Sequence, residues 1–171
     1  MTAIPIRITT KFILGHPAHF VALGFGTGLS PVAPGTVGTL LAFPFFLALK
    51  ALLGPFDSAL SAADCLAALG IFFVLGIWAC EKTGRDLGVA DHGGMNWDEV
   101  VAFMLVLLFT PETWGWQLFA FFAFRFFDVL KPPPIGHFDR TLKGGLGVMF
   151  DDILAAFYTL LLMAAVKQVL G

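Results

Sequence analysis

The stretch that decides the fold is Arg125–Asp152, RFFDVLKPPPIGHFDRTLKGGLGVMFDD. It contains two Arg, two Lys and four Asp in a chain of which only 13% of the residues are charged. The runs of Phe, Leu, Ala and Val on both sides of it are too apolar for an aqueous surface. This contrast predicts a short polar segment between two helices that lie in a membrane.

The composition of the whole chain supports the same conclusion. The 171 residues are 58% hydrophobic and have a mean hydropathy of +0.87, far above the values of soluble domains. We therefore expect an all-α fold, a polytopic membrane helical bundle of about five apolar helices, formed by a single integral-membrane domain over residues 1–171. A net charge of −2 provides no broad cationic field, so nucleic acid is excluded as a partner. No obligate protein partner is inferred.

Apolar runs predict where the helices lie. Their expected ranges are Val37–Leu53, Ala62–Cys80, Trp97–Thr110, Trp114–Leu130 and Gly147–Val169. The third run is short for a bilayer, which needs about 20 residues, so we expect that helix to span only partially. Gly and Pro interrupt residues 17–35, which predicts a re-entrant or interfacial N-terminal segment before the first helix. The N-terminus lacks a long apolar run and a cleavage site, so we expect it to be retained.

The basic residues predict the orientation in the membrane. They fall before the first helix and in the loops after the second and fourth: Arg7, Lys11, Lys82, Arg85, Lys131, Arg140 and Lys143. The other loops contain no Lys or Arg, so the basic loops are expected in the cytoplasm. Lys50 lies near the opposite end of its helix, where its amine can reach the interface. Cys65 and Cys80 lie in apolar sequence and are expected to be buried free thiols rather than a disulfide or metal site.

Acidic residues are expected to converge at the cytoplasmic ends of the helices. They are Asp98, Glu99, Asp128, Asp151 and Asp152. Carboxylates at this depth are costly and suggest function. Capping of a helix N-terminus explains one acid, but it does not explain two adjacent pairs, or Asp128 at a C-terminus where the helix dipole is unfavourable. Ligands that offer only oxygen favour Mg²⁺ or Ca²⁺ over zinc or copper.

Three of these acids are the predicted metal ligands, namely Asp98, Glu99 and Asp152. Ala155, Ala156 and Thr159 follow Asp152 at spacings of three, four and seven, and such a stripe of small residues faces neighbouring helices. Asp152 is therefore expected to point inward, with Asp151 about 100° around the helix.

Cationic and hydroxyl groups near the acids are candidates to bind a phosphate. They are Thr36, Thr39, Arg125, Lys131, Arg140 and Lys143. Each has a simpler alternative: the two Thr could cap a helix, and Arg125 could form an ion pair that anchors its helix. The glycines at 144, 145 and 147 could expose backbone N–H groups to an anion or form only a tight turn.

The loop after the second helix adds three polar residues, Asp86, Asp91 and His92. His92 is a possible proton shuttle, but a hydrogen-bonding role within the loop is the simpler interpretation.

Four stretches of the sequence resemble the phosphatidylglycerophosphatase A family of bacterial membrane phosphatases. They are GFGTGLSPVAPGTVGTL (24–40), GRDLGVADHGGMNWDE (84–99), FRFFDVLKPPPIGHFDR (124–140) and KGGLGVMFDD (143–152). The resemblance implies a Mg²⁺-dependent phosphatase of the bacterial cytoplasmic (inner) membrane, with its active site on the cytoplasmic side. Its substrate would be the phospholipid phosphatidylglycerophosphate, whose phosphate monoester it would hydrolyse to give phosphatidylglycerol.

The family motifs also carry individual positions over to this chain. They are Thr36, Thr39, Asp98, Glu99, Arg125, Asp128, Lys131, Asp139, Asp151 and Asp152. Two alternatives remain without the resemblance. A cation transporter would place acids near the middle of the bilayer, whereas here they lie at helix ends. A CDP-alcohol phosphotransferase would carry a motif that begins Asp-Gly-x-x-Ala-Arg, which this sequence lacks.

Overall fold

The computed structural model describes residues 8–54 and 59–170, and within these ranges every regular element is a helix. This confirms the all-α prediction. Arg7 lies outside the described residues. In chain order the helices are α1 (Thr10–Leu14), α2 (Pro17–Ala22), the 3₁₀ helix η1 (Gly24–Leu29), α3 (Pro34–Leu53), α4 (Ala59–Leu87), α5 (Trp97–Phe109), α6 (Trp114–Leu130), α7 (Ile135–Thr141) and α8 (Gly144–Leu170).

The five apolar helices that the sequence predicts are α3, α4, α5, α6 and α8, but α4 is longer than expected. It continues past Cys80 to Leu87, so Lys82, Arg85 and Asp86 lie on its last turns and not in a loop. Ion pairs spaced by four stabilise this extension. Arg85 lies 2.6 Å from Glu81, and Lys82 pairs with Asp86.

Only three helices in the described ranges are long and apolar enough to cross a membrane. These are Pro34–Leu53, Ser61–Leu87 and Gly144–Val169. The expectation of about five spans is therefore reduced to three. The 13 residues of α5 cover about 20 Å, less than a bilayer core. Since α5 packs on α3, α4 and α8 and most of its side chains are buried, it forms the centre of the bundle.

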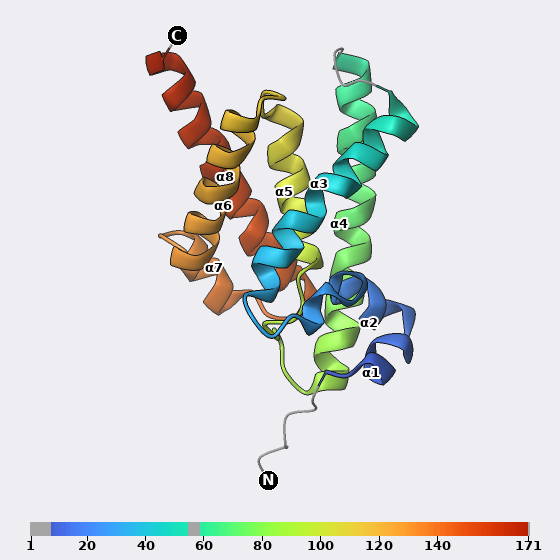
Figure 1. Ribbon diagram of the computed structural model, residues 1–171. Helices are drawn as coiled ribbons and strands as arrows, with labels where there is room; N and C mark the ends of the chain where they lie inside the picture. The colour runs from blue at the N-terminus through green and yellow to red at the C-terminus, as the bar shows by residue number, and fades with distance from the viewer. Residues whose placement is uncertain (1–7, 55–58, 171) are drawn as a thin grey trace.

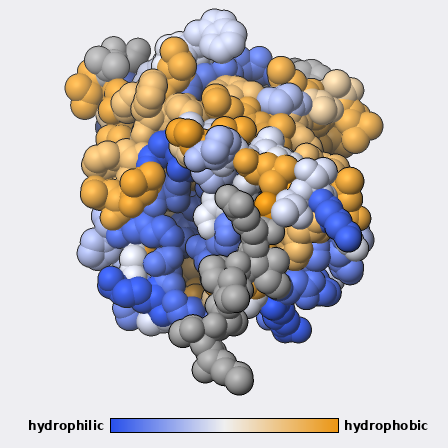
Figure 2. Space-filling view, turned by 60° about the horizontal axis from the view of Figure 1, so that its bottom comes forward, coloured by the Kyte–Doolittle hydropathy of each residue, from blue (hydrophilic) through white to orange (hydrophobic). Residues whose placement is uncertain are grey.

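The bundle has one polar end. Figure 1 shows the beginnings of α3, α5 and α8 and the end of α6 in the lower half of the molecule, where α7 also lies. In Figure 2 hydrophilic residues gather over this end and hydrophobic residues cover the rest of the visible face. The predicted convergence of these helix ends is confirmed.

The Gly- and Pro-rich N-terminal segment lies at this polar end beside α4 (Figure 1). Its chain turns through positive φ at Gly24, Phe25 and Gly26. A Cβ on Gly24 would collide with Oδ1 of Asn96, so glycine allows the close approach. Asn96 donates hydrogen bonds to Oγ1 of Thr27 (2.9 Å) and to the carbonyl of Pro34 (3.0 Å). The segment is thereby attached to the residue that precedes α5.

Two smaller predictions concern the cysteines and Lys50. Cys65 and Cys80 are buried and free, as expected. Lys50, near the end of α3, pairs with Glu112 in the connection between α5 and α6. This pair marks the opposite end of the bundle.

Candidate active site

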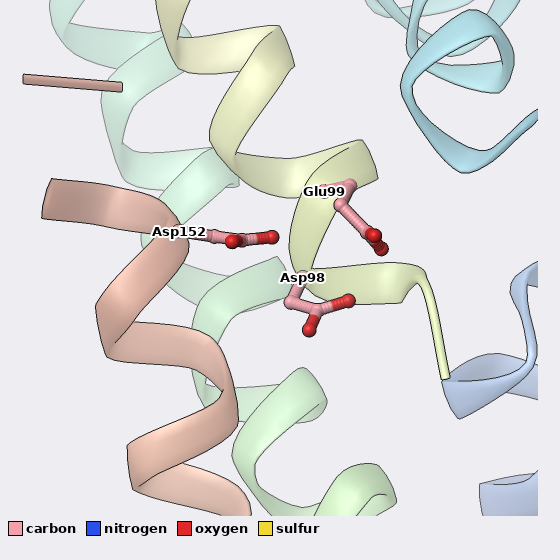
Figure 3. Close-up of side chains that lie close together, drawn as sticks. All are labelled: Asp98, Glu99 and Asp152. Carbon is pink, nitrogen blue, oxygen red and sulfur yellow. The ribbon is translucent and has the colours of Figure 1, made fainter. Parts of the chain in front are cut away.

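Three carboxylates from two helices meet at the polar end of the bundle. Asp98 and Glu99 lie in the first turn of α5, and Asp152 lies in the third turn of α8. Each offers one oxygen to a group whose members lie within 4.8 Å of one another. In Figure 3 the Asp152 side chain points from α8 towards α5, where the other two lie. These are the three residues predicted as metal ligands, and the geometry allows them to hold a cation together.

Burial of these carboxylates leaves oxygen atoms without partners. Asp98, Glu99 and Asp152 are 8%, 9% and 3% exposed. Asp98 Oδ1, Glu99 Oε2 and Asp152 Oδ2 have no hydrogen-bond partner among the described residues. A buried, unpartnered carboxylate oxygen is costly, and a hard cation prefers such oxygen ligands. The donor set therefore fits a divalent cation.

The packing of α8 agrees with the prediction from its small residues. Ala155, Ala156 and Thr159 are fully buried, and α8 contacts α4, α5 and α6. Asp151 is also buried, but it pairs with Lys131 on a different side of the site. The two adjacent Asp residues therefore have different partners, because successive residues on a helix point about 100° apart.

Arg125 on α6 connects three helices at the site. Its Nη1 lies 2.6 Å from Asp128 Oδ2 and 3.6 Å from Glu99 Oε1, and it donates to Thr39 Oγ1 at 3.3 Å. The Thr39 hydroxyl donates to the carbonyl of Gly35 at 3.0 Å. One guanidinium thus holds a carboxylate of α5, a carboxylate of its own helix and a hydroxyl of α3.

Gly35 allows α3 to come this close to α5. A Cβ at this position would collide with Glu99 Oε1 and lie 3.2 Å from Arg125 Nη2. The sequence predicted a turn or re-entrant segment up to this residue, before the first long helix. Instead Gly35 lies in the first turn of α3, which begins at Pro34.

The alternative interpretation of Thr36 and Thr39 as caps of this helix is wrong, and their predicted role in phosphate binding stays a prediction. The N-cap is Ala33, with no side-chain cap, because Pro34 takes the first helical position that suits its fixed φ. Thr36 is partly buried, two residues into the helix.

Lys131 is the second positively charged residue of the site, after Arg125. It follows the last residue of α6 in a left-handed conformation (φ 44°), and its Nζ pairs with Asp151 and lies 2.6 Å from Asp139 Oδ1. Burial lowers the pKa of Lys131, but the hydrogen bonds to Asp139 and Asp151 outweigh it and raise the pKa above its usual range. The hydrogen bond from Lys131 holds the pKa of Asp139 below its usual range. Lys131 is therefore fully charged at the site.

A polar cavity of about 340 Å³ lies beside Asp139, which pairs with Lys131. Its walls come from the loop after α4, from α7 and from the start of α8: Ala90, Asp91, Asp139, Leu142, Lys143, Gly144, Gly147 and Val148. Lys143 is exposed, and its Nζ donates to the carbonyl of Asp139 at 3.2 Å. Arg140 is exposed on α7.

The glycines at the start of α8 have a different role from the predicted anion site. The N–H of Gly145 donates to Glu81 Oε2 at 2.7 Å, so a carboxylate of α4 already binds it. A Cβ on Gly145 would collide with the carbonyl of Ile77, and one on Gly144 would collide with Glu81. The prediction of free N–H groups is wrong at Gly145, because close packing of α4 on α8 brings Glu81 to this helix end.

Sequence reasoning missed Glu81 and the contact between α2 and α4. His19 Nε2 lies 2.7 Å from Asp86 Oδ2, and Lys82 pairs with the same oxygen. The sequence placed Asp86 in a loop after the second helix and gave no role to Glu81, because the predicted helix ended at Cys80. His92 follows its simpler interpretation, since its Nδ1 accepts a hydrogen bond from the N–H of Gly94 at 3.0 Å.

Comparison with known proteins finds a family and relatives that cover most of this chain. The family model described as phosphatidylglycerophosphatase A matches residues 20–167. A phosphatidylglycerophosphatase A of Haemophilus influenzae is 44% identical over 158 residues, which cover 92% of this chain and 93% of the relative. The Escherichia coli protein of the same name is 41% identical over 147 residues, 85% of this chain and 81% of the relative.

A third relative carries a different name. It is a putative phosphatidylinositol-3-phosphatase of Bacteroides thetaiotaomicron, 41% identical over 154 residues that cover 88% of this chain and 94% of the relative. No solved structure matches the chain. The family model covers most of the sequence, including all the acids gathered at the polar end. The chain therefore belongs to the phosphatidylglycerophosphatase A family and is a phosphatase.

Proposed function

We propose that this protein is a Mg²⁺-dependent lipid phosphatase that hydrolyses the phosphate monoester of phosphatidylglycerophosphate to give phosphatidylglycerol in phospholipid biosynthesis. The observation that carries the proposal is the cluster of buried carboxylates with unpartnered oxygens, Asp98, Glu99 and Asp152. The cluster lies at the polar end of a bundle with membrane-length helices, and relatives that cover most of the chain bear the name of this activity.

Mg²⁺ is the cation that suits this ligand set best. It is usually held by one or two carboxylates together with substrate phosphate. Bound there, it would offset the charge of the phosphate and make a water molecule more acidic. Asp98, Glu99 and Asp152 would hold it, and Arg125 would fix the position of Glu99 through their 3.6 Å contact.

The cations of the site are suited to bind the phosphate. Arg125 and Lys131 present charged N–H groups on the two sides of the acidic cluster, and both are held in place by carboxylates. A phosphate that approaches would compete with Asp128 for Arg125 and with Asp139 for Lys131. We propose that the two residues orient the phosphoryl group for in-line attack. The polar cavity beside Asp139 and Lys143 has room for the glycerol headgroup.

The attacking group is proposed to be water. An aspartyl-phosphate is the chemical alternative, but carboxylates that hold a cation are poorer nucleophiles. Asp128 is also unsuited, because its Oδ2 binds Arg125 at 2.6 Å. Protein quenched with acid during turnover should carry no phosphoryl group that hydroxylamine removes. A labelled aspartate would overturn this route.

The decisive experiment is phosphate release from phosphatidylglycerophosphate by the purified protein in detergent. We expect activity with added Mg²⁺, loss of activity with EDTA, and recovery when Mg²⁺ is restored in excess. The Glu112→Gln variant is the matched control, since this acid lies at the opposite end of the bundle and should behave like wild type. Activity that survives EDTA would contradict the metal site.

The name of the Bacteroides relative supplies a competing substrate, phosphatidylinositol 3-phosphate. It should be tested in the same assay at equal surface concentration. We expect phosphatidylglycerophosphate to be preferred in kcat/KM, in line with the names of the other two relatives. The reverse preference would reassign the substrate while leaving the phosphatase chemistry unchanged.

A further inference from the structure

An apolar groove of about 460 Å³ lies between α4, α5 and α8. Its lining consists entirely of apolar residues and one glycine: Leu66, Leu69, Gly70, Phe73, Val101, Leu105, Leu146, Phe150 and Ile153. On each helix these residues are spaced mainly by three or four, so three helix faces form its walls. The groove covers about two turns of α4 and of α8, or roughly 10 Å along each.

The groove begins beside the carboxylate cluster. On α5, Asp98, Val101 and Leu105 are spaced by three and four, which places them on one face of the helix. Asp98 lies at the N-terminal end of that face, and Val101 and Leu105 line the groove. On α8, Ile153 lines the groove and directly follows Asp152, although the two side chains point about 100° apart. A molecule with its phosphate at the acids would thus have this groove within reach of its apolar part.

The direction of the groove is away from the polar end. Gly145 contacts Ile77 and Glu81, and Gly76 faces Met149, so α4 and α8 run antiparallel and pack closely near the start of α8. Leu66 lies nearer the start of α4, and the start of this helix is at the opposite end of the bundle. On α4 and α5 the groove therefore extends from the level of the site away from the polar end, whereas on α8 its residues lie between the start of the helix and the level of Asp152.

A lipid chain fits this groove better than a second protein helix. Helices that pack in membranes meet through small residues that allow close approach. Here the walls are Leu, Phe, Ile and Val, and Gly70 is the only small residue among them. A Cβ on Gly70 would meet no atom within 4 Å, so no part of the described chain fills the space beside it.

We propose that the groove binds one acyl chain of the phospholipid substrate and so positions the headgroup at Asp98, Glu99 and Asp152. This inference rests on the proposed function, since it assigns a place to the apolar part of the same substrate. The groove would act as a specificity site, which favours substrates with long chains over short ones. No bond is made or broken there.

The test is to fill the groove without touching the acids. Gly70→Leu places a side chain in open space on a helix that prefers Leu to Gly. We expect KM for dipalmitoyl phosphatidylglycerophosphate to rise about threefold or more, because several carbon–carbon contacts to the acyl chain are lost. KM for the dibutyryl substrate, whose chains are too short to extend along the groove, should not change.

Gly115→Leu is the matched control. A Cβ on Gly115, in α6, would also meet no atom within 4 Å, and this glycine lines a cavity with Trp116 and Phe119 near the opposite end. We expect this variant to keep wild-type KM values for both substrates. Equal KM values for Gly70→Leu and wild type on the dipalmitoyl substrate would overturn the groove proposal. Failure of the wild type to hydrolyse either substrate would instead contradict the proposed function.

A second measurement uses the wild-type protein and does not depend on a variant. Phosphatidylglycerophosphate with a photoreactive diazirine in one acyl chain should label the groove residues of α4 and α8, such as Leu69, Phe73 and Phe150. Labelling confined to other faces would overturn the proposal. A dimer in wild type that Gly70→Leu converts to a monomer would show that a second copy occupies the groove, with the same consequence.

Discussion

At the scale of single residues, the site is defined by carboxylates that the fold buries without giving each oxygen a partner. Asp98, Glu99 and Asp152 remain close together although they repel one another, and such an arrangement is stable only if something compensates for the charge. Among the described residues Arg125 compensates Glu99 in part. The unpartnered oxygens are therefore the strongest sign of function in the molecule.

The first prediction concerns these acids. Asp98→Asn, Glu99→Gln and Asp152→Asn should each lower kcat by about a hundredfold or more, as the loss of one electrostatic catalytic group does. Because repulsion between buried charges is relieved, the thermal unfolding midpoint should stay the same or rise. Phosphate release and thermal unfolding in detergent measure the two effects. Near-normal activity in two of the variants would refute the assignment of the site.

The second prediction separates the roles of the two cations. Lys131→Gln should raise KM more than it weakens the response to Mg²⁺, because Lys131 contacts Asp139 and Asp151 rather than the three clustered acids. Arg125→Gln should affect both, since Arg125 also contacts Glu99. Titration of activity with Mg²⁺ and with substrate distinguishes these outcomes. If Lys131→Gln only lowers expression and leaves KM unchanged, Lys131 is a helix anchor.

At the scale of helices, glycines set the distances between the elements that carry the site. Gly35 brings α3 to Glu99, and Gly145 brings α8 to α4. Both occur in short Gly-containing stretches that would ordinarily indicate turns. In the structure each lies within the first turn of a helix that could span a membrane. Their missing side chains allow close contact between helices.

The third prediction tests Gly35. Gly35→Ala places a methyl group against Glu99 Oε1 and close to Arg125, so it should displace the carboxylate and reduce activity by about tenfold or more. Gly115→Ala is the control, because its added methyl group meets open space near the start of α6, at the opposite end of the bundle. Both variants replace glycine in a helix, which by itself favours folding. Equal activity of the two variants would show that the contact at Gly35 is unimportant.

The fourth prediction concerns the junction of α4 and α8. Glu81→Ala removes the acceptor for the N–H of Gly145 and should lower the free energy of unfolding by about 1 kcal/mol, because Glu81 is partly exposed. Glu112→Ala, at the opposite end, provides the comparison. Chemical denaturation in detergent measures the difference. A larger loss for Glu112→Ala would contradict the stabilising role of this junction.

At the scale of the whole molecule, most charged residues of the described chain lie at one end of the bundle, and few, such as the pair Lys50 and Glu112, lie at the other. Figure 2 shows hydrophilic residues gathered at one end, and the clustered acids lie in the first turn of α5 and the third turn of α8, which begin at that end. This arrangement suits an enzyme whose substrate keeps its tails in the bilayer. It differs from an ion path, which would place polar groups along the length of the bundle.

The fifth prediction is that this polar end faces the cytoplasm. The basic residues at this end favour that orientation. Because Cys65 and Cys80 are fully buried, a single new cysteine can be labelled selectively by a maleimide that does not cross membranes. Thr113→Cys should react in intact cells after the outer membrane is opened, and Thr141→Cys only after the inner membrane is broken. Both positions are exposed, and the reverse pattern would invert the orientation.

The sequence by itself determined the helical class, the existence of the five apolar helices and the end at which the acids gather. Hydrophobic runs and the distribution of charge along the chain report these features directly, because each depends on composition over ten or more residues. The ranges of α5 and α6 were accordingly close to Trp97–Thr110 and Trp114–Leu130. The acids and the basic residues of the site followed from charge and helix ends, and the resemblance to a family supplied the substrate and added Asp139.

Only the tertiary structure decided which polar groups meet. The pairing of Lys131 with Asp151 and the separate placement of Asp152 depend on how α6 and α8 pack. The length of α4 depends on ion pairs and on contacts with α2 and α8, which no local pattern contains. The number of membrane-length helices fell from five to three because α5, with 13 residues, and α6, with 17, are both too short to cross a bilayer. Side-chain packing decides which helices distant in the chain contact each other. The hydropathy pattern of the sequence does not predict these contacts.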